Sequence, residues 1–477
     1  MSVSPRANPP VSWEKVVLTH VGIFLFMATW GYGGNSTWVK GVLAWWGLLG
    51  VLIIPSVLLT DRRRVSLGRL AWLVPCALFN LLVLASAFTP GLRIIHRGRE
   101  DFYTPVSLSA WQPSAAVPAL ALRGLWLFDA IYLSCFNLAW IVRRRRALRG
   151  LLLFAVGNAL VLSIFGTVQK LLGAPGVYFG YLRTRQEYFF ASFLYHNHWG
   201  AFIVLMVATC LGLVWHYGRR RQGERDLFHT PAFGGLVAVA FLAATAPLSA
   251  SRSCTILMGI VLGGAFTHWV LRLARQRRQY KESVWPPLVS ALVAGLLAIS
   301  GAAYLASQTI AARFATTKAQ VADMVARGGI GSRWTLYQDT WRMAGDRRWF
   351  GWGMDSYPIV FHFYNSQAVS PVDYLTSSYH DAHNDWVQSA AEHGLIGTAL
   401  LSGLALVPLV FVWRRPPRSP LPAYLLAGCA LIVLYSLVEF PFGNTGVVLT
   451  WWVCFFTAAG YTRLQHNADA ADAAAGD

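Results

Sequence analysis

Residues 38–64 are Trp-Val-Lys-Gly-Val-Leu-Ala-Trp-Trp-Gly-Leu-Leu-Gly-Val-Leu-Ile-Ile-Pro-Ser-Val-Leu-Leu-Thr-Asp-Arg-Arg-Arg. The stretch 38–60 holds one charged residue, Lys40, and is long enough to cross a hydrocarbon core of about 30 Å as a helix. The three arginines that follow are typical of the cytoplasmic end of a membrane span. This stretch therefore predicts both a membrane helix and its orientation.

The same pattern recurs along the 477-residue chain, in which 55% of the residues are hydrophobic and 13% are charged. Soluble domains carry about 25% charged residues, so ordinary cytosolic, disordered, collagen-like and coiled-coil classes are excluded. Hydropathy predicts about twelve spans. They are 15–33, 38–60, 68–88, 120–142, 149–172, 194–217, 232–249, 252–272, 286–307, 394–413, 421–440 and 444–463.

The net charge of +19 would suggest a nucleic-acid partner if the protein were soluble. However, 21 of the 40 Lys and Arg residues lie in five short segments on one side of a twelve-span chain. These segments are 61–69, 143–149, 219–225, 272–281 and 414–418. The positive-inside rule makes this side cytoplasmic, together with both termini. Membrane insertion explains most of the charge, and no nucleic-acid partner is predicted.

The expected fold is an all-α polytopic membrane bundle of about twelve helices with a large helical loop on the outer side. We divide it into an N-terminal transmembrane region (1–149), a second transmembrane half (150–307), the loop (308–393), C-terminal helices (394–463) and a disordered tail (464–477). Long loops among tight connections are usually functional. Within this loop, a helix is expected from Ser332 through Trp341 and another over 379–393.

Arginines on the outer side run against the positive-inside bias and suggest an anionic ligand, because guanidinium groups match phosphate oxygens. The sharpest case is Arg252, at the outer mouth of the span 252–272. For each arginine alone, a solvated face or a salt bridge is the simpler interpretation. The candidates are Arg93, Arg97, Arg99, Arg183, Arg185, Arg252 and Arg333.

A second candidate is Tyr379-His380-Asp381-Ala382-His383-Asn384-Asp385. On a helix, His380 and His383 would share a face, where they would suit a metal site or a general base. No third strong ligand follows at a recognisable spacing, so no metal is predicted, and a structural histidine at the loop end is a further alternative. His196-Asn197-His198, which opens the span 194–217, is by itself typical of a polar helix start.

Several motifs follow one another on the predicted outer side. Ser251-Arg252 precedes Gly259 and Gly263, and Ser332-Arg333-Trp334 precedes Gly351-Trp-Gly353. His383-Asn384 is followed after nine residues by Gly394-Leu-Ile-Gly397, and Glu439-Phe-Pro441 lies near the C-terminus. In this order the motifs resemble those of the O-antigen ligase/polymerase superfamily of polytopic glycosyl-transfer enzymes, over about 150–463. His196 departs from the Asn-x-Asn pattern usual there.

The resemblance implies a GT-C-like membrane enzyme at the periplasmic face of a bacterial inner membrane. It would move a glycan from a polyprenyl (undecaprenyl) diphosphate to a hydroxyl of an acceptor glycan or glycolipid, with inversion and without a metal or other cofactor. The catalytic residues would be Arg252, Arg333 and His383. The candidates for substrate binding are Arg93, Arg183, Arg185, Asn197, His198, Tyr379, His380, Asn384 and Asp385.

Within this class, ligation to lipid A–core, chain extension by a polymerase of O-antigen or exopolysaccharide, and transfer to protein share the same motifs. Two other classes stay open. Twelve spans also suit a transporter or lipid flippase, although charge within the spans is scarce and no internal repeat is evident. A metal-dependent hydrolase would use His380, His383 and Asp385.

Overall fold

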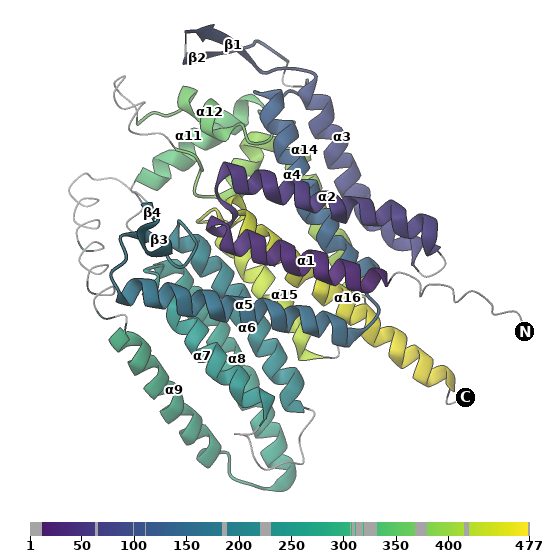
Figure 1. Cartoon of the computed structure of the whole chain (residues 1–477), viewed down its shortest axis with the longest axis vertical. Helices are drawn as coiled ribbons and strands as arrows, with labels where there is room; N and C mark the ends of the chain where they lie inside the picture. The colour runs from purple at the N-terminus through teal and green to yellow at the C-terminus, as the bar shows by residue number, and fades with distance from the viewer. Residues whose placement is uncertain are drawn as a thin grey trace, which may run out of the picture.

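A computed structural model gives the fold, and it describes residues 12–475 except 63–64, 99, 110, 184–187, 220–229, 306, 308–310, 312–317, 319–331, 368–378 and 415–418. A helix lies at each of the twelve predicted spans (Figure 1). They are α1 (Trp13–Trp30), α2 (Thr37–Thr60), α3 (Val74–Ala87), α4 (Pro118–Trp140), α5 (Arg145–Leu171), α6 (His196–Arg219), α7 (Pro231–Leu248), α8 (Arg252–Tyr280), α9 (Trp285–Leu305), α14 (Asp385–Trp413), α15 (Pro420–Tyr435) and α16 (Thr445–Ala475).

Nine helical segments among the described residues are long and apolar enough to cross a membrane, one of them formed by α3 and the preceding 3-10 helix η3 (Leu67–Leu73). Helices suit this setting because each backbone group inside a bilayer has to be hydrogen-bonded within the protein. The prediction of an all-α, multi-pass membrane protein is therefore confirmed.

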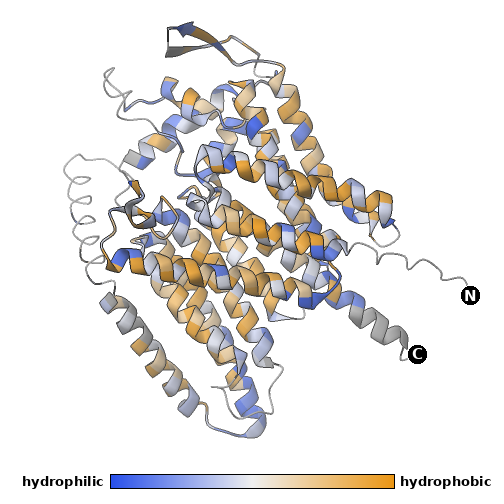
Figure 2. Ribbon diagram, in the orientation of Figure 1, coloured by the Kyte–Doolittle hydropathy of each residue, from blue (hydrophilic) through white to orange (hydrophobic). Residues whose placement is uncertain are grey.

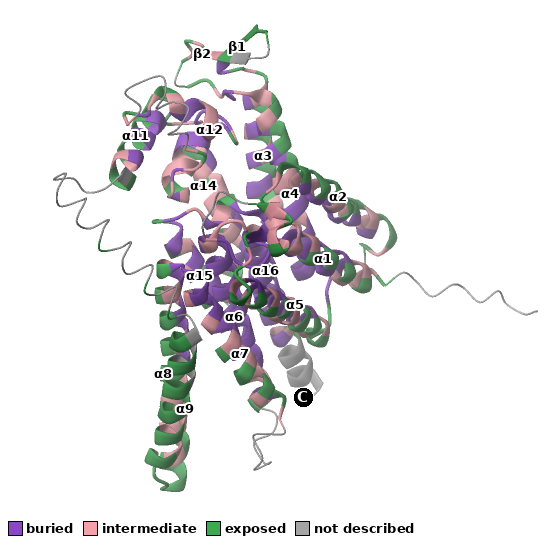
Figure 3. Cartoon of the chain, turned by 60° about the vertical axis from the view of Figure 1, so that its left-hand side comes forward, coloured by how far each residue is buried: buried purple, intermediate pink, exposed green. Residues whose placement is uncertain are grey.

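The centre of the bundle is formed by α6 and α16, whose apolar stretches are 89% and 83% buried. Helices α4, α5, α7 and α15 pack around them. By contrast, α8 and α9 lie on the flank, where most of their side chains are exposed (Figure 3). Many of these exposed residues are apolar (Figure 2), for example Ile256 on α8 and Leu296 on α9, as expected of helices that face lipid.

Two small β-hairpins interrupt the helical architecture on one side. Strands β1 (Leu92–Arg97) and β2 (Glu100–Pro105) pair antiparallel, with Ile95 opposite Phe102. This hairpin extends from the end of α3 (Figure 1). The shorter strands β3 (Gly176–Val177) and β4 (Leu182–Arg183) also pair antiparallel.

The described part of the large loop forms a small unit with its own apolar core. It consists of α11 (Ser332–Asp346), α12 (Tyr357–Val360) and the 3-10 helix η5 (Phe361–Phe363). Leu336, Met343, Trp352 and Tyr357 are buried in this core together with Ala391 of α14. The helix predicted to start at Ser332 is confirmed, and its packing holds α11 against the outer part of α14.

A break in α14 joins this unit to the membrane helices. Gly394 has φ +65° and ψ −173°, a conformation that is essentially restricted to glycine and interrupts the helical hydrogen bonds. The segment 347–353 supplies backbone hydrogen bonds in place of the interrupted ones. The amides of Trp352 and Gly353 donate to Ala391 O and Glu392 O at 2.9 and 2.8 Å, and the amide of Leu395 donates to Arg348 O at 2.8 Å. The Gly351-Trp-Gly353 and Gly394 motifs are thus two halves of one backbone junction.

Two local predictions were wrong. Residues 379–384 are not helical, and α14 begins at Asp385, because the Asn384 side chain accepts hydrogen bonds from the amides of Trp386 and Val387 and so caps the helix. The tail from residue 464 was expected to be disordered, whereas α16 continues to Ala475. Its alanines have the highest helix propensity of any residue, and this outweighs the acidic composition.

We predict that Gly394→Ala destabilises the protein. A Cβ at residue 394 would lie 2.4 Å from the backbone of Trp349, and the backbone conformation is strained for alanine by about 1–3 kcal/mol. The thermal midpoint of the purified protein should fall by several degrees. Gly263→Ala on α8, where no atom lies within 4 Å of the added Cβ, is the matched control and should leave Tm unchanged or slightly higher. Equal midpoints for both variants would contradict the proposed junction.

Candidate active site

Glu439 lies at the centre of a polar cluster at the ends of the helices beside the large loop. It follows α15 and precedes the 3-10 helix η6 (Pro441–Gly443), and only 2% of its surface is exposed. A carboxylate so deeply buried requires cationic or hydrogen-bond partners. Its partners come from α6, from α11 and from the segment before α14, which are far apart in the sequence.

Arg333 is the cationic partner supplied by the large loop. Its Nη2 donates to Glu439 Oε1 at 2.5 Å and its Nη1 donates to Val438 O at 3.2 Å. Burial alone would lower the pKa of Arg333, but the neighbouring Glu439 carboxylate outweighs burial and raises this pKa. The side chain is still 49% exposed, so other N–H groups of the guanidinium are open to a ligand.

His383 is the second partner, and its Nδ1 lies 3.3 Å from Glu439 Oε2. The backbone of His383 adopts a left-handed conformation with φ +53°. Its carbonyl accepts a hydrogen bond from Tyr337 Oη of α11 at 2.9 Å, and its ring packs edge-on against Phe440 at 4.7 Å between centroids. A neutral imidazole that donates from Nδ1 to the carboxylate keeps Nε2 as the proton acceptor.

Although burial alone raises the pKa of Glu439, the hydrogen bond with His383 and the positive charge of Arg333 bring this pKa below its usual value. Glu439 therefore stays ionised at neutral pH. Burial and the negative charge of Glu439 raise the pKa of Tyr195, whose phenol lies 3.4 Å from Glu439 Oε2 and stays protonated.

Asn197 connects the cluster to the membrane helices. Its amide donates to Glu439 Oε1 at 2.9 Å, and its Oδ1 accepts a hydrogen bond from Ser251 Oγ at 2.6 Å. Ser251 is the N-cap of α8, so this chain of contacts fixes the position at which Arg252 starts that helix. The Arg252 side chain is exposed at the first turn of α8.

The residues next to His383 serve mainly to hold it. Asn384 Nδ2 donates to Leu437 O at 2.7 Å, and the Asp385 carboxylate accepts a hydrogen bond from the amide of Phe442 at 3.0 Å. These bonds attach the start of α14 to the loop that carries Glu439. The sequence suggested that Asn384 and Asp385 contact sugar. In the structure, both side chains form hydrogen bonds with the protein.

The other predicted binding residues are dispersed. His198 is buried, and its Nε2 lies 3.2 Å from Phe440 O. His380 is exposed, and Tyr379 donates a hydrogen bond to Gln367 at 3.2 Å. Arg93 on β1 and Arg183 on β4 are exposed, and no contact with Glu439, Arg333 or His383 is recorded for either. Arg185 lies outside the described residues.

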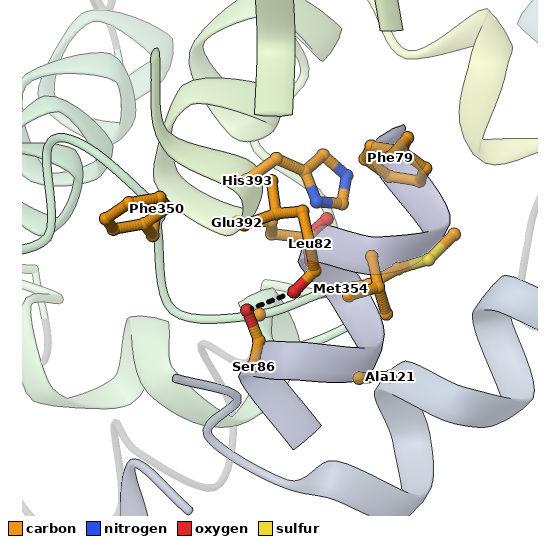
Figure 4. A pocket seen from close by; sticks show the side chains of 10 residues that line it. Phe79, Leu82, Ser86, Ala121, Phe350, Met354, Glu392 and His393 are labelled. Atoms are coloured by element: carbon orange, nitrogen blue, oxygen red, sulfur yellow. Dashed lines mark hydrogen bonds between the residues drawn. The ribbon is translucent and has the colours of Figure 1, made fainter. Parts of the chain in front are cut away.

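A small pocket lies next to the backbone junction rather than at Glu439. It is lined by Phe79 and Leu82 of α3, by Met354, and by Glu392 and His393 of α14 (Figure 4). Glu392 accepts a hydrogen bond from the amide of Tyr357 at 2.9 Å.

Among the described residues, no group of three or more His, Cys, Asp or Glu side chains is arranged to hold a metal ion.

Comparison with known families finds a matching model for part of the chain. A family model described as O-antigen ligase matches residues 237–402, from α7 into α14, a segment that includes Arg252, Arg333 and His383. This match supports the O-antigen ligase superfamily and, with it, a ligase- or polymerase-type membrane enzyme. No curated protein matches the chain.

Sequence reasoning grouped Arg252, Arg333 and His383 but did not place Glu439 among the site residues of this ligase-type enzyme. Glu439 and Asn197 lie outside the matched segment, 56 residues after and 186 residues before His383. One signal was present in the sequence. An acidic residue within an apolar run marks a functional position with a partner, and Glu439 is such a residue.

We predict that Glu439→Gln lowers Tm at neutral pH, because the buried Arg333 and His383 contacts lose their negative partner. The pKa of Glu439 is depressed in the folded protein, so its contribution to stability is present above its unfolded pKa of about 4.5 and disappears as the pH falls through the folded value. The difference in Tm between wild type and variant should therefore shrink below about pH 4.5.

Glu282→Gln is the matched control. The Glu282 side chain, which pairs with Arg277, is 55% exposed, and exposed ion pairs contribute little to stability. A Tm difference for Glu439→Gln that is independent of pH would show that the carboxylate charge is not what stabilises the cluster.

Proposed function

We propose that the protein is an O-antigen ligase-like glycosyltransferase. It transfers a glycan from a polyprenyl diphosphate to an acceptor hydroxyl at the outer, periplasmic face of the inner membrane. The observation that carries this proposal is the convergence of His383 and Arg333 on the buried Glu439 at the outer helix ends. This convergence supports a proposed base and a proposed cation side by side, where a lipid-linked donor would present its diphosphate.

His383 is the proposed general base. Glu439 engages Nδ1 and orients the imidazole, so that Nε2 accepts the proton of the acceptor hydroxyl. Glu439 is a positioning residue in this scheme, since it acts through His383 and Arg333. A carboxylate that pairs with the histidine also stabilises the imidazolium formed during the reaction.

The leaving group requires cations. Arg333 is held by Glu439 and Val438 O on one edge, and its exposed edge is open to a phosphate oxygen. Arg252 sits at the N-terminus of the long helix α8, where the helix dipole also favours an anion. Fixed cations of this kind stabilise the charge that develops on the diphosphate in the transition state.

The reaction then balances without a further reactant. The acceptor oxygen forms a bond to the anomeric carbon while the bond from that carbon to the phosphate oxygen breaks. The proton moves to His383, and polyprenyl diphosphate leaves with the electron pair. Attack opposite the leaving group inverts the anomeric configuration.

The exposed face of α11 is the proposed glycan contact. Trp334 directly follows Arg333, and Trp341 lies seven residues further along, about 10 Å along the helix axis. Both side chains remain exposed, at 49% and 62%, although tryptophan is usually well buried. Trp352, by contrast, is packed in the core of the loop unit. The structure thus separates two tryptophans able to stack on sugar rings from one that stabilises the fold.

We predict that His383→Asn abolishes most of the glycan transfer. Asparagine tolerates the left-handed backbone of residue 383, so the fold should persist while the base is lost. The rate should fall by about 10²–10⁴-fold when purified lipid-linked glycan and acceptor are supplied to the protein in proteoliposomes. His268→Asn, at a histidine that contacts Tyr424 in the interior of α8, is the control and should retain activity. Normal transfer by a well-folded His383→Asn variant would exclude the proposed base.

We also predict that replacing both Trp334 and Trp341 with Ala raises KM for the glycan substrate with a smaller change in kcat, because stacking contributes to binding rather than to chemistry. The matched control is Trp413→Ala, at an 83% exposed tryptophan on the opposite end of α14. An unchanged KM would place the glycan elsewhere.

The product of the same assay distinguishes the acceptor: a single glycan on lipid A–core for a ligase, or a lengthened chain for a polymerase.

A further inference from the structure

Three arginines lie between the helices at the end of the bundle opposite to Glu439. They are Arg69 of η3, Arg149 of α5 and Arg463 of α16, and all three are partly buried, whereas Arg143 to Arg146 of the neighbouring connection are exposed. The connection between α4 and α5 and the later part of α16 lie side by side there (Figure 1), and hydrophilic residues gather at this place (Figure 2). The positive-inside rule explains why arginine is abundant at this end. It does not explain why these three are buried.

The contacts of these arginines are with neutral groups. Arg463 Nη2 donates to Val142 O, Arg69 Nη1 to Trp140 O at 3.5 Å, and Arg149 Nη1 to Tyr461 Oη at 3.0 Å. The two carbonyls lie at the C-terminal end of α4, where the helix dipole favours cations. However, a guanidinium has five N–H groups, and the Nε atoms of Arg149 and Arg463 are buried without a hydrogen-bond partner.

The charges of the cluster are not neutralised by the carboxylate beside it. Among the described residues, Arg69, Arg149 and Arg463 form no ion pair. Glu14, the nearby acid, is engaged by Arg144 Nε at 2.6 Å and by the amide of Arg143 at 3.1 Å. Arg463 lies within electrostatic reach of Arg69 and Arg143. Like charges in a poorly solvated site repel one another far more than in water, so a bound anion would stabilise this arrangement.

We propose that Arg69, Arg149 and Arg463 bind the phosphate group of an anionic phospholipid in the membrane leaflet at this end of the bundle. Guanidinium groups suit a phosphodiester, and basic pockets between membrane helices hold lipid headgroups. The site lies at the ends of the spans, and Leu67, two residues before Arg69, exposes 43% of its surface and offers an apolar contact to the proposed lipid. This site is independent of the proposed transfer reaction.

The experiment measures the Tm of the purified full-length protein in neutral detergent. Phosphatidylglycerol, phosphatidylcholine and inorganic phosphate are added separately, and native mass spectrometry counts the retained phosphatidylglycerol. Wild type is compared with Arg69→Gln/Arg463→Gln. The control Arg145→Gln/Arg146→Gln removes the same charge from exposed positions of the same region. Arg69→Gln alone serves as the test variant if the double variant does not fold.

For wild type and for the control, we expect phosphatidylglycerol to raise Tm and to remain bound, while phosphatidylcholine and inorganic phosphate have little effect. In the Arg69→Gln/Arg463→Gln variant this increase should be lost, together with the retained lipid. Two results would overturn the proposal. If the variant keeps the full increase, the arginines only cap α4. If inorganic phosphate alone reproduces the increase, the site is one for a free anion.

Discussion

The buried carboxylate of Glu439 contacts three segments that are far apart in the sequence. An ionised group so poorly exposed is costly without partners, and its partners are Arg333 of the large loop, His383 at the end of that loop and Asn197 of the central helix α6. Docking of the loop onto the membrane helices therefore also brings the proposed catalytic groups together. Loss of Arg333 or His383 would leave a buried negative charge and would disturb the remaining partners.

The break at Gly394 provides the second attachment of the loop. The hydrogen bonds that α14 loses at this residue are replaced by bonds to 347–353, directly after α11. Helix α11 is thus held at both ends, by the Arg333–Glu439 pair at its start and by the backbone junction beyond its end. Sites built on supported helices are more precise than sites on loops alone. This arrangement explains how a long loop can position a cation and contact the His383 carbonyl through Tyr337.

Much of this could be predicted from the sequence, because membrane spans depend on local hydropathy and orientation depends on local charge. The twelve helices are of this kind. The grouping of His383 with Arg333 instead came from the resemblance of their motifs to those of a known family. The centre of the cluster was not predicted, since nothing local to Glu439 or Asn197 shows that they meet across 242 residues. The helix expected over 379–384 failed for a related reason. His380 and His383 have helical spacing. However, His383 has a left-handed backbone and Asn384 caps α14, so the helix begins only after both histidines.

Arginine has different physical roles at the two ends of the bundle. The burial of each side chain and the partner that it contacts distinguish these roles better than the number of arginines at each end. Arg145 and Arg146 are exposed, as the positive-inside rule leads one to expect of cations at the membrane surface. Arg333 is about half exposed and has a carboxylate partner that holds its guanidinium group in place. Arg69 and Arg463 are also partly buried, and their hydrogen bonds among the described residues go to carbonyl groups. Because partial burial without a counter-charge is unfavourable in the protein alone, we propose that a phospholipid phosphate supplies the negative charge.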